Sequence, residues 1–73
     1  MSKQELTNQV EFSKDYSKKS QAIKLTTSKQ VTYYFKSLTK MTGNFLFGKT
    51  VDNEKRRVIA NSIVNVEVVE VVH

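Results

Sequence analysis

The sequence predicts a small α+β fold in which a strand, a helix and a β-hairpin precede an apolar C-terminal segment. Apolar and polar residues alternate over residues 21–26, which is typical of a strand with one buried face. The spacing then changes, because apolar residues recur at intervals of three and four over residues 31–41, as on one face of a helix. Two apolar runs on either side of a polar turn at residues 51–54 predict the hairpin.

The first 20 residues are polar and rich in lysine. Ser2 and Glu5 have the spacing of a capping box, in which a serine and a glutamate close the start of a helix. Apolar residues are too sparse in this segment to make a continuous stripe. We therefore expect residues 1–20 to form a partly ordered arm and residues 21–73 to form a single small domain.

The helix is expected over residues 28–42. The apolar residues on one face of it are Val31, Tyr34, Phe35, Leu38 and Met41. Thr27 and Gln30 have capping-box spacing at its start, and Gly43 stands where a left-handed C-terminal cap belongs. The β-branched and aromatic residues of this segment favour a strand by propensity. Periodicity and the two end signals together favour the helix, and we predict a helix.

Residues 44–50 and 56–60 are the expected strands of the hairpin. Gly48, inside the first of them, indicates a bulge or a close approach of another backbone. The terminal segment, residues 62–72, is either an apolar helix or a strand. Its valines favour a strand, whereas its polar residues recur every two to three positions, and both alternatives stay open.

The net charge of +5 is unevenly distributed along the 73 residues. Residues 1–49 hold nine lysines against three acidic residues, whereas residues 50–73 hold three basic residues against four acidic ones. A basic half of this kind attracts nucleic acid or an acidic protein surface. The alternative is a lysine-rich surface that is simply solvated.

The composition and the motifs indicate a protein that is not an enzyme and needs no cofactor or metal. Cysteine is absent, no apolar run is long enough to span a membrane, and a cytoplasmic location is expected. His73 is the only histidine and the last residue, and the acidic residues show no spacing that suggests paired acid–base chemistry. The sequence Gly48-Lys49-Thr50 has the letters of a phosphate-binding loop, but it lies in an expected strand instead of opening a helix.

The segment Asn61–Glu70 has the order Asn, Ser, two aliphatic residues, any residue, an aliphatic, two of any kind, an aliphatic and an acidic residue. This order resembles the regulatory-serine motif of HPr, the histidine-containing phosphocarrier of the sugar phosphotransferase system. The resemblance implies a partial HPr-like fold and Ser62 as a regulatory phosphorylation site. The stretch that matches the family's phosphorylated histidine, residues 27–30, contains no histidine, and the chain ends where the family's fourth strand should begin.

The HPr resemblance implies a non-catalytic protein-binding or regulatory module. Its expected partner-binding residues are Lys29, Tyr33, Lys36 and Lys40 on the predicted helix, with Asn61 and Ser62. Because the chain lacks the family's last elements, either the N-terminal arm or a second chain must cover the sheet, and the C-terminal segment is the expected interface of a homodimer.

A second resemblance is to the Sm-like barrels of the Hfq type. Residues 31–43 can be read as two strands ending in the glycine that lets the second one bend, with Ile59–Val64 as the closing motif. The family's tyrosine-lysine-histidine motif is replaced here by Ile59, Ala60 and Asn61. This resemblance implies a small basic nucleic-acid-binding protein as the alternative function. A helix over residues 62–72 would favour the HPr reading, and a strand that closes a barrel would favour the Sm-like one.

Overall fold

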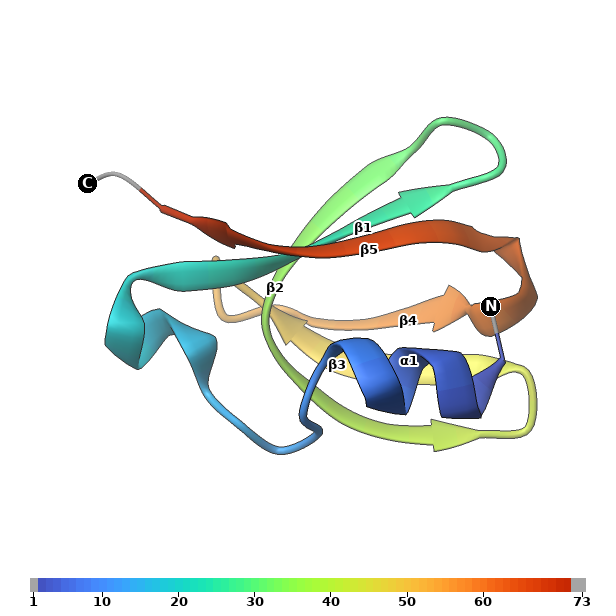
Figure 1. Cartoon of the computed structure of the whole chain (residues 1–73), viewed down its shortest axis with the longest axis horizontal. Helices are drawn as coiled ribbons and strands as arrows, with labels where there is room; N and C mark the ends of the chain where they lie inside the picture. Colours follow the sequence, from blue (N-terminus) through green and yellow to red (C-terminus); the bar gives the residue numbers. More distant parts are fainter. Residues whose placement is uncertain (1, 72–73) are drawn as a thin grey trace.

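Five β-strands follow a short N-terminal helix in the computed structural model, which describes residues 2–71 (Figure 1). The elements are α1 (Lys3–Gln9), the 3-10 turn η1 (Tyr16–Lys19), β1 (Gln21–Thr27), β2 (Thr32–Thr42), β3 (Phe45–Thr50), β4 (Lys55–Ile59), the 3-10 turn η2 (Ala60–Ser62) and β5 (Ile63–Glu70). His73, weighed above as a lone histidine, lies outside the described residues.

The strands form one antiparallel sheet in the order β4-β3-β2-β1-β5. The first part of β2 pairs with β1 and its second part pairs with β3, so β2 belongs to both halves of the sheet. Figure 1 shows that β2 is strongly curved between the two halves. The curvature wraps the sheet around the core and leaves β4 and β5 as its two edge strands.

The bend in β2 has a local cause. The register between β2 and β3 shifts twice, between Phe35 and Ser37 and between Leu38 and Lys40, and such bulges bend a strand and increase its twist. Gly48 lies opposite Leu38, and a Cβ atom on Gly48 would stand 2.8 Å from the Ser37 carbonyl oxygen. The bent strand therefore crosses β3 where β3 has no side chain, which confirms the close approach predicted for Gly48.

The N-terminal segment contributes to the core. Ser2 caps α1 by accepting a hydrogen bond from the Glu5 backbone N–H at 3.2 Å, as the capping-box spacing predicts. The hydrophobic cluster consists of Leu6, Val10, Tyr16, Ile23, Leu25, Phe35, Leu38, Leu46, Val58, Ile63 and Val66. The Ser13 N–H donates to the Leu38 carbonyl oxygen at 2.6 Å, so this segment also satisfies a backbone acceptor at the bulge of β2.

The predicted helix over residues 28–42 is wrong, because residues 32–42 form β2. Phe35 and Leu38 are both buried although they are three residues apart, since the irregularity between them reverses the alternation of the strand. Because of the two bulges, apolar residues of this extended strand recur at the intervals that are typical of a helix. The β-branched and aromatic residues, which favoured a strand, indicated the observed conformation.

The HPr-like α+β fold class is therefore also wrong: the fold is mostly β, with a five-stranded antiparallel sheet and one short α-helix among the described residues. The predicted strands at residues 21–26, 44–50 and 56–60 are confirmed, and the last two pair as the expected hairpin. The terminal segment, left open above, forms the strand β5 and pairs with β1 of the same chain.

Candidate nucleic-acid interface

The outer surface of strands β2, β3 and β4 combines aromatic and basic side chains. Along β3, Leu46, Gly48 and Thr50 are buried, so the alternation of the strand turns Phe45, Phe47 and Lys49 outward. We call the basic and aromatic side chains that face outward on these three strands the basic–aromatic face. Its members are Lys40, Phe45, Phe47, Lys49, Lys55 and Arg57.

The register of the sheet arranges this face in rows. Phe47 pairs with Lys40 of β2 on one side and with Arg57 of β4 on the other, so a basic residue flanks it on each neighbouring strand. In the next row Lys49 lies between Ser37 and Lys55. Directly opposed residues in a sheet have side chains close enough to interact, so the residues of each row are neighbours on the surface.

The rings and the cations of the face touch each other. The Lys40 Nζ lies 5.5 Å from the centre of the Phe47 ring, and the Arg57 Cζ lies 4.7 Å from the centre of the Phe45 ring. The two rings are 6.5 Å apart between centroids and inclined by 53°. Each ring therefore offers a stacking surface with a positive charge beside it, which is the combination that a nucleotide requires for its base and its phosphate.

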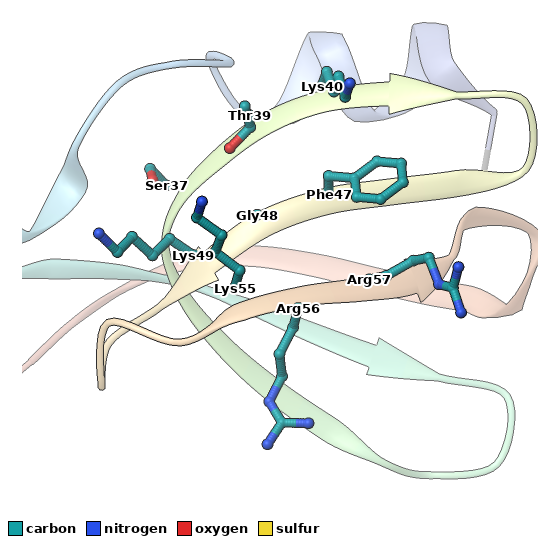
Figure 2. A pocket seen from close by; sticks show the side chains of 9 residues that line it. All are labelled: Ser37, Thr39, Lys40, Phe47, Gly48, Lys49, Lys55, Arg56 and Arg57. Carbon is teal, nitrogen blue, oxygen red and sulfur yellow. The ribbon is translucent and has the colours of Figure 1, made fainter.

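The face encloses a hollow of about 510 Å³ (Figure 2). It is lined by Ser37, Thr39, Lys40, Phe47, Gly48, Lys49, Lys55, Arg56 and Arg57. None of these described residues is acidic, so the hollow has a single sign of charge. Figure 2 shows Arg56 pointing to the other side of β4 from Lys49, and its guanidinium pairs with the Glu54 carboxylate at 3.1 Å.

The six residues predicted for a partner surface do not form one face. Lys40 alone belongs to the basic–aromatic face, and Lys36 donates to the Asn53 side-chain oxygen beside the β3–β4 turn. The others, Lys29, Tyr33, Asn61 and Ser62, lie near the turn between β1 and β2 or in η2. Lys29, Tyr33, Lys36 and Lys40 would share one face of a helix with 3.6 residues per turn. In the extended, bulged strand β2 and the turn before it, they lie apart.

Ser62, the predicted phosphorylation site, is not at the start of a helix. It ends the 3-10 turn η2 before β5, and its hydroxyl donates to the Ile59 carbonyl oxygen at 2.6 Å. A phosphate on Ser62 would therefore not gain the stabilisation that the N-terminus of an α-helix gives to an anion. Phosphorylation of Ser62 itself stays a prediction.

Five members of the face are not among the residues that the sequence predicts to contact a partner: Phe45, Phe47, Lys49, Lys55 and Arg57. A signal for them was present, because Phe45, Phe47 and Lys49 alternate within a predicted strand. The short turn of the predicted hairpin also limits which residues of β3 and β4 can pair. The contribution of Lys40 required knowledge of the bulges in β2.

Other kinds of site have less support in the structure. Gly48-Lys49-Thr50 lies inside β3, as predicted, and does not open a helix. Within residues 2–71, no group of three or more histidine, cysteine, aspartate or glutamate side chains is placed to hold a metal ion. No described helix has the length and apolar character that crossing a membrane requires.

Comparisons of the chain with models of protein families, with curated proteins and with solved structures find no match.

Proposed function

We propose that this protein binds single-stranded nucleic acid on the basic–aromatic face. The observation that carries the proposal is the row Lys40–Phe47–Arg57, in which a half-buried aromatic residue pairs with a basic residue on each neighbouring strand and the Lys40 ammonium lies over its ring. Bases stack on aromatic side chains while lysine and arginine neutralise the phosphates, and neither interaction requires a particular base sequence.

Single-stranded nucleic acid fits this face better than a duplex does. The bases of a duplex are stacked on each other, so the rings of Phe45 and Phe47 can only stack on bases that are already unpaired. The net charge of +5 adds long-range attraction to any polyanion. The Sm-like alternative expected a terminal strand that closes a barrel; β5 is a strand, but it pairs with β1 and not with β4, so it does not close one and the proposal does not rest on it.

The regulatory role implied by the HPr resemblance presupposes a helix–sheet arrangement, whereas the fold is mostly β. We keep the cytoplasmic location as part of the proposal, supported by the absence of cysteine. Single-stranded RNA is present there in quantity, and a binding module of this kind needs no cofactor.

Fluorescence anisotropy with a labelled oligouridine tests the proposal. The expected affinity falls steeply as salt rises from about 50 to about 200 mM, and a duplex of the same length binds less tightly. Changing both Lys49 and Lys55 to glutamine should reduce the slope of log affinity against log salt by up to about 1.4, since each phosphate contact contributes about 0.7 for single strands. The matched control changes both Lys18 and Lys19 to glutamine; these are exposed lysines of η1 outside the face, and the change should reduce the slope less.

The aromatic part of the site is tested by Phe47→Leu, which keeps an apolar side chain but removes the ring. Stacking contributes about 1–3 kcal/mol per base, so the affinity should fall by roughly 5- to 150-fold. Tyr34→Leu is the control, because Tyr34 is an exposed aromatic residue of β2 that does not line the hollow. Equal losses for the two variants, or no binding by the unchanged protein at about 50 mM salt, would contradict the proposal.

A further inference from the structure

A second hollow lies next to β4, at the end of the β1–β2 hairpin. It has a volume of about 250 Å³, and its walls include Lys29, Val31, Tyr33, Arg57, Ile59 and Ser62. We call it the hairpin groove. None of its described lining residues is acidic, so it has the same sign of charge as the basic–aromatic face.

Tyr33 gives the hairpin groove an aromatic surface with a fixed position. The residue is partly buried against the hydrophobic core, and its ring centroid lies 6.2 Å from that of Phe35, which is fully buried. Lys29 is exposed in the turn that leads into β2 and supplies a cation to the same groove. The groove thus repeats the pairing of one ring with a cation seen on the basic–aromatic face.

Arg57 connects the two hollows, because it lines both of them. The neighbouring residue Arg56 connects the face to a different hollow, which borders Tyr33 from the other side and is also lined by Asp52 and Glu54. Two carboxylates repel a phosphate backbone, and the ion pair with Glu54 already neutralises Arg56. A polyanion that leaves the face across β4 therefore meets a favourable charge along the path past Arg57. The path past Arg56 is unfavourable, because it leads to the two carboxylates.

We infer that one nucleic-acid strand bound on the basic–aromatic face continues over Arg57 into the hairpin groove. There a further base stacks on Tyr33, and the adjoining phosphate meets Lys29. This inference rests on the proposed function and extends it, because it assigns a second subsite and a path between the two. The ligand is then a single strand of several nucleotides that passes around the edge strand β4, and a mono- or dinucleotide fills only part of the site.

The test compares oligouridines of about 4 and about 12 nucleotides, lengths within the range that small β-domains occupy on single strands. Tyr33→Leu and Lys29→Gln should each weaken binding of the longer oligomer by roughly fivefold or more and leave the shorter one within about twofold. Tyr33→Phe keeps the ring and should bind the longer oligomer as the unchanged protein does. Lys19→Gln is the charge control, and circular dichroism checks that each variant is folded.

The outcomes separate this inference from the proposed function. If Phe47→Leu weakens binding of both lengths while Tyr33→Leu and Lys29→Gln affect neither, the face binds nucleic acid and the path into the hairpin groove is overturned. If Phe47→Leu has no effect on either length, the proposed function itself fails. Lys29 is exposed in a turn, so its variant remains informative even where the change at Tyr33 unfolds the protein.

Discussion

Gly48 shows how one residue determines both the fold and the site. Its missing side chain lets the bent part of β2 approach β3, and this crossing brings Lys40 into line with Phe47. A bulge or close approach was predictable from a glycine inside a strand. Which backbone approaches Gly48, and which lysine is thereby positioned, depends on contacts between strands that the sequence does not display.

Gly48→Ala is therefore expected to be destabilising. The added Cβ would stand 2.8 Å from the Ser37 carbonyl oxygen and 2.9 Å from the Phe35 Cδ1, so backbone and core must both move. Overpacking of this kind costs about 1–3 kcal/mol, measurable as a lower free energy of unfolding in urea.

Gly43→Asn is the comparison for this variant. Gly43 has a φ of +59°, which asparagine tolerates, and apart from Gly43 and its two chain neighbours no atom lies within 4 Å of a Cβ built there. The effect of this change should be smaller than that of Gly48→Ala. If Gly48→Ala does not lower the free energy of unfolding, the backbone of β2 does not approach β3 as closely as the structure shows.

The elements differ in how far the sequence predicted them. The strands β1, β3 and β4 were predicted, because alternation over a few residues depends only on local pattern. The sequence of β2 predicts a helix instead, since its two bulges shift which side of the strand each residue faces. The apolar residues then recur with the spacing of a helix. The sequence of β5 fits both a helix and a strand. It is a strand in the structure because β1 provides its backbone hydrogen-bonding partners.

The helix α1 is short and polar, yet it is expected to stabilise the whole fold. Leu6 is fully buried in the hydrophobic cluster, so Leu6→Ala should cost about 2–5 kcal/mol in the free energy of unfolding. Gln4→Ala, an exposed position of the same helix, should change it by less than about 0.5 kcal/mol. Similar melting temperatures for the two variants would show that α1 does not belong to the core.

At the scale of the whole molecule, the sheet has two unpaired edge strands, β4 and β5, and the two carry side chains of opposite charge. β4 carries Lys55, Arg56 and Arg57, whereas β5 carries Glu67 and Glu70 and exposes Val64, 57% of whose surface is accessible. Unprotected edge strands pair readily with other chains. The homodimer through the C-terminal segment, expected from the sequence, stays a prediction.

That prediction has a direct measurement. Light scattering over a range of concentrations should detect a dimer, and Val64→Lys should shift it towards the monomer, because a lysine on an edge strand opposes pairing. Val51→Lys is the matched control, since Val51 is also exposed but lies in the β3–β4 turn. A monomer at every concentration would refute the dimer.

The sequence by itself determined the local features of this protein: the extended character of β1, β3 and β4, the turn between β3 and β4, the cap of α1 and the excess of basic residues. Each of these depends on neighbours a few positions apart. Only the tertiary structure decided that β2 is a strand and that Lys40, Phe47 and Arg57 meet in one row. The physical reason is that register, bulges and the curvature of the sheet set cross-strand neighbours, and these arise from contacts between segments far apart in the chain.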